Sequence, residues 1–271
     1  RAYAMYFVKY IEGMKAEGIL IDAITVQNEP LNPKNTPSMV MLAPEQDKFI
    51  KEDLGPAFRK AGLATKVILY DHNCDRPDYP ISILKDPAAY QYVDGSGFHL
   101  YGGTIDAMSK VHDAFPKKNL YFTEQMVVDR PGTDQTKIAD PEARIVIGAT
   151  RNWSRNVLLW NLAADPQFGP HTNDGGCTMC EGAITLDGDH VTRNLAFYTI
   201  AHASKFVRPG SVRIGSNEPD SLPNVAFQTP QGKTVVVVVN RSDSAKQFNI
   251  EYRGKAFTAT LNAGAAGTYI W

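Results

Sequence analysis

The chain lacks the features that would place it across a membrane or on nucleic acid. No apolar run approaches the roughly 20 residues that a transmembrane helix needs, and the all-valine run from Val235 to Val239 has the length of a strand. Positive charge forms no stripe, negative charge forms no tail, and the formal net charge is −1. Within this chain, the absences argue against a membrane span, a basic nucleic-acid surface and a disordered acidic tail.

Cysteine is also scarce, with three residues in the chain. Cys177 and Cys180 form a Cys-x-x-Cys pair in a glycine-rich loop. A zinc site would need two more ligands at metal spacing, and only His171 lies nearby. A redox motif would instead open a helix after a strand. We therefore predict no metal site and leave two interpretations, a short-range disulfide or two unpaired thiols, with Cys74 unpaired in either case.

An initiator methionine and a signal peptide are absent at Arg1, where helix-like sequence begins at once. We therefore expect a mature or truncated product rather than a native start. The chain has 271 residues, of which 43% are hydrophobic and 21% charged. This is the balance of a globular protein with one large domain, or one domain and a smaller one.

What the chain does contain is an alternation of strand-like and helix-like segments. The expected strands are Ala23–Asn28, Lys66–Asp71, the run ending at His99, Asn119–Glu124 and Asn156–Leu162. The expected helices cover residues 1–17, 44–61, 81–92, 105–115, 141–153 and 193–207. Strands that alternate with helices indicate βα units and a parallel sheet.

The pattern changes at Arg208-Pro209-Gly210. Short β-rich runs separated by turn residues follow, at residues 211–215, 224–228, 234–240, 247–252, 256–261 and 268–271. They predict an antiparallel β-sandwich. The expected fold class is therefore α/β plus all-β: residues 1–207 belong to a barrel-type domain, and residues 208–271 form a β-sandwich packed on it. A hairpin that turns at Asp187-Gly188 is expected before the last helix.

Two glutamates stand at the ends of strand-like runs. Glu29 follows Ile24–Asn28, directly before Pro30, and Glu124 follows Tyr121–Thr123. The two runs are separated by about three βα units of roughly 30 to 40 residues, so in an eight-stranded ring they face each other across its mouth. One such glutamate is more often a helix cap or an ion-pair partner. A pair is what a retaining glycosidase needs, one acid to protonate the leaving oxygen and one carboxylate to attack the anomeric carbon.

These residues carry a resemblance to a known family. The motifs are Thr25–Pro30, Gly97–Tyr101, Phe122–Glu124 and Leu159–Leu162, in that order along the chain. Together they resemble glycoside hydrolase family 30, which contains glucosylceramidases, β-1,6-glucanases and xylanases. The resemblance covers nearly the whole chain. The loop of Cys177 and Cys180 also looks similar to the β-1,6-glucanase branch, which favours the disulfide.

The resemblance implies more of the barrel than this chain supplies. The five expected strands would be strands four to eight of a (β/α)8 barrel, so three strands and a piece of the sandwich would precede Arg1. We therefore expect a partial barrel whose N-terminal half lies in the parent protein, and a chain that is inactive by itself. Half of the substrate-holding walls would be missing, and positioning is worth roughly 7–11 kcal/mol of a barrier.

The resemblance also implies roles for site residues. Glu124 would be the nucleophile, Glu29 the acid/base, and Asn28 a ligand of the sugar 2-hydroxyl. His99 and Tyr101 lie at another strand end and are expected to bind substrate, since such side chains can hydrogen-bond the nucleophile and the region of the ring oxygen.

Further residues are candidate substrate contacts. Trp160 ends the last expected strand, where its ring can form the floor of a sugar subsite. His72 lies in a loop from which Asp71 and Arg76 can also reach substrate. His171 and Asp174, in the loop that follows Trp160, are expected to line a positive subsite.

Ionisation of the two glutamates is expected to differ. Glu29 must carry a proton beside an ionised Glu124, so like-charge repulsion and burial are expected to raise the pKa of Glu29. The scheme needs no cofactor.

The lead hypothesis is a retaining hydrolase of β-glucosidic linkages with β-1,6-glucan as substrate. Glucosylceramide or another β-glucoside is the alternative substrate. A hypothesis of another class is a non-catalytic carbohydrate-binding fragment. The expected location is secreted, periplasmic or on the cell surface, with no nucleic-acid partner.

Overall fold

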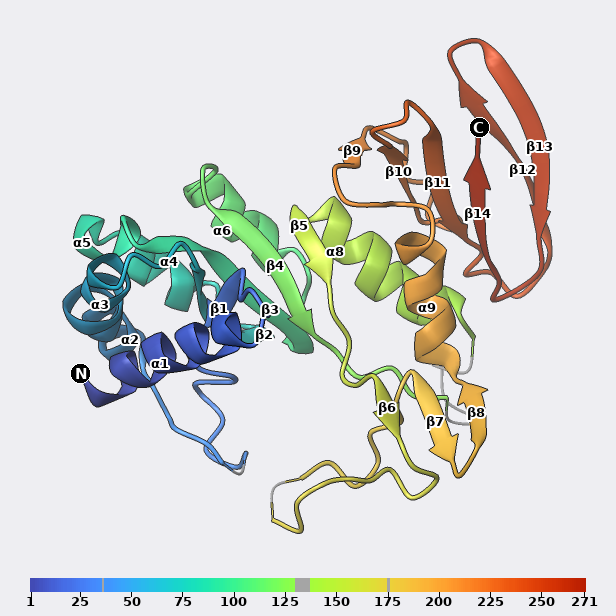
Figure 1. Ribbon diagram of the computed structural model, residues 1–271. Helices are drawn as coiled ribbons and strands as arrows, with labels where there is room; N and C mark the ends of the chain where they lie inside the picture. The colour runs from blue at the N-terminus through green and yellow to red at the C-terminus, as the bar shows by residue number, and fades with distance from the viewer. Residues whose placement is uncertain (36, 130–136, 175) are drawn as a thin grey trace. The chain divides into compact units, whose positions relative to one another are not determined.

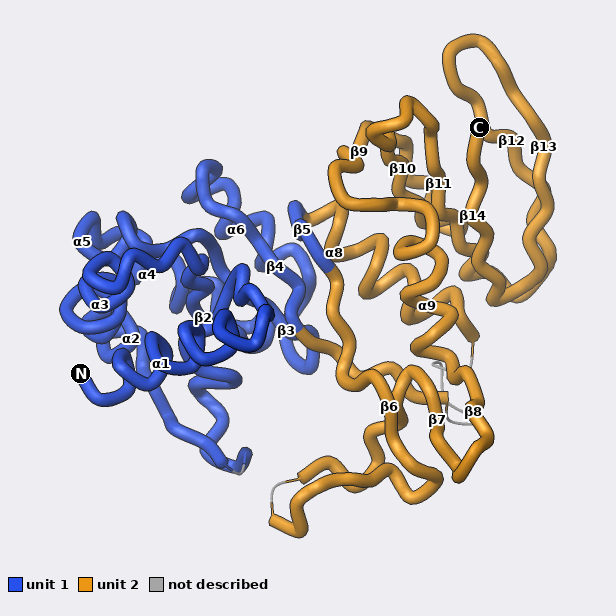
Figure 2. Tube along the Cα trace, viewed as in Figure 1, with its two compact units in different colours: residues 1–123, 153–156 blue, residues 124–152, 157–271 orange. Residues whose placement is uncertain are grey.

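The computed structural model describes residues 1–35, 37–129, 137–174 and 176–271 (Figure 1). The chain divides into two compact units (Figure 2). The first comprises residues 1–123 and 153–156, and the second comprises residues 124–152 and 157–271. Among the described residues, no helix combines the length and the apolar composition needed to cross a membrane.

A five-stranded sheet organises the first unit, and its strands lie side by side in chain order. They are β1 (Ala23–Thr25), β2 (Lys66–Cys74), β3 (Val93–Gly103), β4 (Asn119–Glu124) and β5 (Ser154–Val157). β1 pairs with β2, and β2 with β3, in parallel. Because parallel neighbours need a crossover, each connection contains a helix. The expected βα series is confirmed.

The helices of the first unit are α1 (Ala2–Ala16), α2 (Ala43–Phe49), η1 (Ile50–Leu54), α3 (Gly55–Lys60), α4 (Asp78–Leu84), α5 (Pro87–Tyr90) and α6 (Ala107–Ala114). Most of them lie close to their expected positions, but the single helix expected over residues 81–92 is two helices, α4 and α5. α1 buries Ala4, Phe7, Val8 and Ile11, which is the i, i+3, i+4, i+7 stripe of an amphipathic helix.

β2 and β3 run further than their sequences predict. β2 continues past Asp71 to Cys74, and β3 continues past His99 to Gly103. Tyr70 and Asp71 have φ values of 72° and 65°, and the register between the two strands shifts directly after Tyr70. An irregularity of this kind lets pairing continue past residues that read as a loop.

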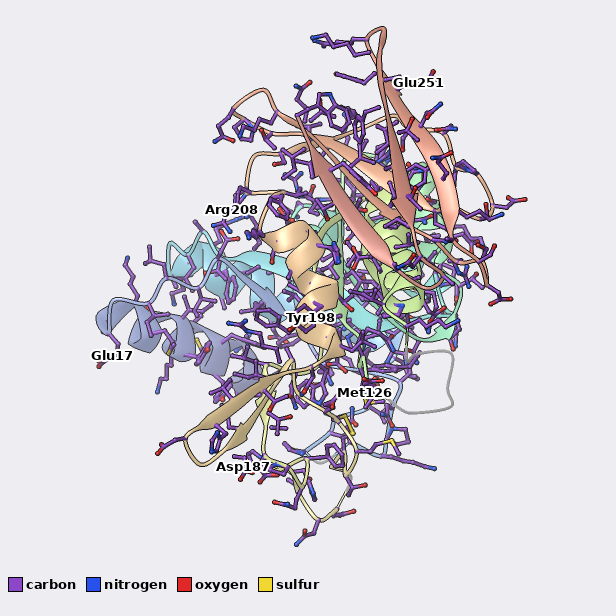
Figure 3. All side chains as sticks on the ribbon, turned by 90° about the vertical axis from the view of Figure 1, so that its right-hand side faces the viewer. Glu17, Met126, Asp187, Tyr198, Arg208 and Glu251 are labelled. Carbon is purple, nitrogen blue, oxygen red and sulfur yellow. A yellow bond between two sulfur atoms is a disulfide. The ribbon has the colours of Figure 1, made fainter. Side chains whose placement is uncertain are left out.

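The second unit begins with helices and a small sheet. The helical segments are α7 (Ala139–Pro141), η3 (Glu142–Ile147), α8 (Gly148–Arg151) and α9 (Leu195–Ser204). The strands β6 (Ala163–Ala164), β7 (Ile184–Asp187) and β8 (His190–Arg193) form a sheet in that order. Asp187 lies at the tip of the β7–β8 hairpin (Figure 3), opposite His190. The hairpin expected at Asp187-Gly188 is confirmed.

Antiparallel sheets complete the second unit, as expected for a sandwich. One has the order β14-β11-β10-β9, and the other pairs β12 with β13. Their strands are β9 (Val212–Ile214), β10 (Asn224–Gln228), β11 (Thr234–Val239), β12 (Lys246–Tyr252), β13 (Lys255–Leu261) and β14 (Ala266–Ile270). The antiparallel pairing agrees with the turn residues that separate the runs.

β11 is buried along its whole length because both faces of its sheet are covered. Val237 shares one core with Ile147 of η3. Val236, its neighbour on the opposite face, shares another core with Phe248 of β12. The four-stranded sheet therefore packs on helices on one side and on the second sheet on the other.

Candidate active site

Glu29 lies beyond the end of β1 and beside β2. The expected strand reached Asn28, whereas β1 ends at Thr25. The backbone N–H of Glu29 donates to the carbonyl oxygen of Asp71 at 2.9 Å, which holds the segment against β2. Glu29 has a φ of 45°, in the left-handed region that residues other than glycine rarely adopt. Such conformations persist where the surroundings impose them, often at functional sites.

Glu124 is the last residue of β4, a strand of the same sheet as β1 and β3. One polar side-chain atom from each of Glu29, His99 and Glu124 lies within 4.8 Å of the others. Among the described residues, no other three acidic, histidine or cysteine side chains converge so closely. Parallel strands bring their carboxyl ends to one edge, and that edge carries both carboxylates.

A buried hydrogen-bond network positions His99. Its Nδ1 lies 3.5 Å from Oε1 of Glu29, and its Nε2 lies 3.2 Å from Oδ1 of Asp71. The hydroxyl of Thr123 donates to the same Asp71 oxygen at 2.6 Å. The side chains of His99 and Asp71 are 1% and 6% exposed. With both ring nitrogens beside carboxylates, the imidazole has little freedom to turn.

Glycine is required at position 97 for this network to form. A Cβ atom there would lie 3.1 Å from both Asp71 Oδ1 and Thr123 Oγ1. That is closer than ordinary van der Waals contact, so a side chain would push the two groups apart. Gly97, which belongs to the family motif, therefore allows β2, β3 and β4 to share one polar cluster.

Two asparagine side chains also hold Glu29. The amides of Asn32 and Asn35 both donate to its Oε2, each at 2.6 Å. Interaction with His99, followed by these two hydrogen bonds, lowers the pKa of Glu29 to about 2, although burial alone would raise it. The expectation of a raised pKa is therefore wrong for this structure. That expectation rested on burial and a neighbouring carboxylate, whereas hydrogen-bond donors to the ionised form outweigh the effect of burial here.

The other expected residues of the first unit lie close to this cluster. His72 is buried on β2, and its burial lowers its pKa. Tyr101 is 42% exposed on β3, with its ring edge-on to His99 at a centroid distance of 6.1 Å. Asn28 is exposed directly before Glu29. Arg76 instead pairs with Asp78 on the surface.

Trp160 does not end a strand, contrary to expectation, because β5 stops at Val157. The chain then pairs with the segment that follows Glu124. The N–H of Trp160 donates to the carbonyl oxygen of Gln125 at 3.0 Å, and Trp160 forms an isolated bridge with Met126. Its side chain is 47% exposed. The indole therefore lies beside the residues that directly follow Glu124, with surface available to a ligand.

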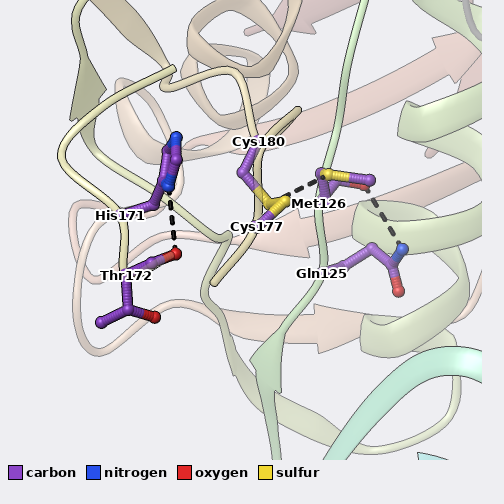
Figure 4. Close-up of a disulfide and its surroundings, with 6 residues drawn as sticks. All are labelled: Gln125, Met126, His171, Thr172, Cys177 and Cys180. Carbon is purple, nitrogen blue, oxygen red and sulfur yellow. Dashed lines mark hydrogen bonds between the residues drawn. A yellow bond between two sulfur atoms is a disulfide. The ribbon is translucent and has the colours of Figure 1, made fainter. Parts of the chain in front are cut away.

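Cys177 and Cys180 are joined by a disulfide (Figure 4). The sulfur of Cys180 lies 3.3 Å from that of Met126, which places the loop against the segment after Glu124. His171, in the same loop, is exposed with its Nδ1 3.2 Å from the carbonyl oxygen of Thr172. Cys74 is free and buried, as expected.

Asn32, Asn35 and Thr123 were not expected at the site. Thr123 stands directly before Glu124 inside a β-branched and aromatic run, where it reads as an ordinary strand residue. Asn32 and Asn35 lie in a proline-rich loop, where asparagine is common for conformational reasons. A second and third asparagine within six residues of a strand-end glutamate is the only signal the sequence offers.

Two sequence profiles match the chain. That of the "Glycosyl hydrolase family 30 TIM-barrel domain" matches residues 1–207, and that of the "Glycosyl hydrolase family 30 beta sandwich domain" matches residues 210–269. Together they account for nearly all of the sequence.

Individual proteins agree with the profiles. The chain is 34% identical over 248 residues to the endo-1,6-beta-D-glucanase BGN16.3 of Trichoderma harzianum, which covers 88% of this chain and 49% of that protein. It is 28% identical over 292 residues to the lysosomal acid glucosylceramidase of Mus musculus, covering 100% of this chain and 56% of that one. The chain therefore spans about half the length of the curated relatives it matches.

Solved structures extend the comparison to the fold. The endo-beta1,6-glucanase BT3312 superposes with a TM-score of 0.92 at 35% identity, over 99% of this chain and 62% of that one. SrfJ from Salmonella typhimurium gives a TM-score of 0.90 at 27% identity, over 99% and 61%. With a profile match that covers most of its length, this chain belongs to glycosyl hydrolase family 30.

Proposed function

We propose that this chain carries the catalytic carboxylates of a retaining β-glycoside hydrolase. The observation behind the proposal is the convergence of Glu29, His99 and Glu124 within 4.8 Å. Retaining enzymes hold their two carboxyl groups about 5–5.5 Å apart, whereas inverting enzymes leave about 6.5–9.5 Å for a water molecule. The spacing supports the retaining class.

In the proposed mechanism, Glu124 attacks the anomeric carbon while Glu29 gives its proton to the leaving oxygen. The glycosidic C–O bond breaks, and a covalent glycosyl–Glu124 intermediate forms. A water molecule then attacks that intermediate while Glu29 accepts its proton, which restores both carboxyl groups. His99, fixed by Asp71, orients Glu29 between the two steps.

The proposed substrate is β-1,6-glucan. Support comes from the endo-1,6-beta-D-glucanases, to which the chain is 34% and 35% identical, against 28% for the mouse glucosylceramidase. Tyr101 and Trp160 are exposed rings on which the C–H face of a sugar can pack. Asn28 and His72 are the proposed polar contacts. Glucosylceramide or another β-glucoside is the alternative substrate within the family.

A carbohydrate-binding role without turnover is the second candidate. It is favoured by one observation, that the chain spans about half the length of the relatives. A site that binds the sugar without aligning its anomeric carbon with Glu124 would give binding without turnover.

We also propose a location outside the cytosol, on the surface or secreted. The disulfide between Cys177 and Cys180 supports it, since disulfides persist in oxidising compartments.

The decisive experiment uses a 2-deoxy-2-fluoro β-glucoside with a good leaving group. It is expected to trap a covalent adduct, which peptide mass spectrometry should locate on Glu124. Glu124→Gln should abolish the adduct. In Glu29→Ala, azide should restore turnover and yield a β-glucosyl azide, because azide replaces water once the acid/base is gone.

Hydrolysis is measured in parallel on β-1,6-glucan, β-1,3-glucan and an aryl β-glucoside. Turnover of β-1,6-glucan that Glu124→Gln removes supports the proposal. Binding of β-1,6-glucan without turnover or adduct supports the second candidate. An adduct on a residue other than Glu124 refutes the assignment of the nucleophile.

A further inference from the structure

The loop that follows Glu29 supplies two neutral donors to a single carboxylate oxygen. Its described residues, 30–35 and 37–41, are called the asparagine loop. Asn32 and Asn35 both donate to Oε2 of Glu29 at 2.6 Å. Neither side chain has a place in the mechanism described so far.

The asparagine loop is anchored at both ends. The N–H of Met41 donates to the carbonyl oxygen of Pro30 at 2.8 Å, and the buried Tyr79 donates its hydroxyl to the carbonyl oxygen of Met41 at 2.7 Å. The hydroxyl of Ser38 donates to the carbonyl oxygen of Asn32 at 2.9 Å. The hydrogen bond between Met41 and Pro30 therefore joins the two ends of the segment that carries both amides.

The amide of Asn32 has a defined orientation. Its Oδ1 accepts the N–H of Lys34 at 3.0 Å, so its Nδ2 group faces Glu29. An amide N–H group forms a stronger hydrogen bond to an ionised carboxylate oxygen than to a protonated carboxyl oxygen. Two such donors on Oε2 therefore favour the carboxylate over the acid.

We propose that Asn32 and Asn35 are positioning residues that stabilise the ionised form of Glu29 and thereby set the pH range in which it can act as an acid. The inference rests on the proposed function for its catalytic consequence. As Glu29 releases its proton to the leaving oxygen, the growing negative charge is met by both amides. The two amides make Glu29 a stronger acid, and for the same reason they lower the fraction of Glu29 that is protonated at a given pH.

Other groups that titrate also face Glu29, and they define what the test must hold constant. They are His99 on β3, Asp71 and His72 on β2, and Glu124 at the end of β4. His99 has the largest effect on the pKa of Glu29, burial opposes it as the second effect, and the two asparagines lower the pKa after these. Removing the amides should therefore return only part of the shift.

The test is an NMR titration of the carboxyl carbon of Glu29 in the ¹³C-labelled chain, identified by its loss in Glu29→Gln. Asn32→Ala and Asn35→Ala should each raise the midpoint by about one pH unit, the size expected for one hydrogen bond to a charged group. The isosteric Asn32→Asp and Asn35→Asp should raise it further. Val40→Ala, an exposed neutral change in the same loop, should leave it unchanged.

If the alanine variants do not fold, the aspartate isosteres carry the test. Midpoints that match Val40→Ala in all four variants overturn the inference. In hydrolysis, the alkaline limb of the kcat/KM profile should move to higher pH in the variants, and kcat should fall while KM stays. A wild-type chain that neither turns over nor binds β-1,6-glucan would refute the proposed function, whereas the titration still decides the inference.

Discussion

At the scale of residues, hydrogen-bond donors decide the state of Glu29. Its side chain is 11% exposed, and burial by itself favours the neutral form. Contact with His99 and with two amides reverses that preference. Asp71 is held in position by Thr123 on one side and His99 on the other. The residues that position Glu29 and Asp71 therefore include members of three strands, β2, β3 and β4.

The lowered pKa of Glu29 predicts a contribution to acid stability. Because the folded pKa lies below the ordinary value of 4.5, the stabilisation is fully present above about pH 5 and is lost as the pH falls toward 2. It amounts to at most about 3 kcal/mol, at 1.36 kcal/mol per pKa unit. Urea unfolding from pH 7 to pH 3 should show the wild type losing more stability than Glu29→Gln. Equal losses would contradict it.

Gly97→Ala should disturb the network around His99. Its Cβ would press on Asp71 and Thr123, so we expect a loss of about 1–3 kcal/mol in the free energy of unfolding and a fall in any hydrolytic rate. Gly13→Ala is the matched control, because nothing lies within 4 Å of its Cβ. In a helix this change should stabilise by about 0.5–1 kcal/mol. Equal changes in the free energy of unfolding for Gly97→Ala and Gly13→Ala would contradict this prediction.

At the scale of elements, η3 carries a buried acid in an apolar setting. Glu142 is 0% exposed, and within the described residues neither of its carboxyl oxygens has a hydrogen-bond partner. Burial raises its pKa well above the ordinary value. The segment around it faces the sandwich through Ala139 and Ile147. A protonated Glu142 is tolerated there, and an ionised one would be costly.

Glu142→Met should therefore stabilise the protein in a pH-dependent way. The unfolded chain ionises above about pH 4.5 while the folded chain stays neutral, so the wild type loses about 1.4 kcal/mol per pH unit until the folded pKa is reached. The gain from Glu142→Met should be large at pH 8 and small at pH 4, by urea unfolding. Glu251→Met, at an exposed site, should show no such trend. A gain independent of pH would point to packing instead.

At the scale of the whole molecule, the β-sandwich is integrated with the helices before it. The core around Val237 combines residues of α7, η3, β10 and β11. Arg151 of α8 donates to the carbonyl oxygen of Asn224 at 2.9 Å and pairs with Glu218 at 3.0 Å. Helices and sheets of the second unit therefore share one core and should unfold together.

Val237→Ala should destabilise this whole unit. Removing two buried methyl groups and leaving a cavity costs about 2 kcal/mol. Tryptophan fluorescence, circular dichroism and hydrogen exchange in α9 should all report the same lowered transition. Val212→Ala, in the same sheet but 64% exposed, should change it little. If Val237→Ala leaves the hydrogen-exchange rates of α9 unchanged, the helices and the sandwich unfold separately.

Much of the fold was predictable because local signals agreed with the tertiary arrangement. β4 and β10 have the bounds that their apolar runs predict, and α1 follows its buried stripe. The predicted C-terminal ends of β1, β2, β3 and β5 differ from those in the structure. There the chain shifts register or leaves the sheet, and pairing partners rather than propensity decide where a strand ends.

By itself, the sequence determined the order of the strands and helices, the change to antiparallel sheets after Arg208, and the two glutamates at the ends of strand-like runs. Only the tertiary structure decided what surrounds those glutamates. Asn32 and Asn35 reach Glu29 because their loop closes on itself, and His99 meets Asp71 because β2 and β3 pair past a shift in register. Ionisation depends on donors within about 3 Å, and that proximity is created by folding, not by spacing along the chain.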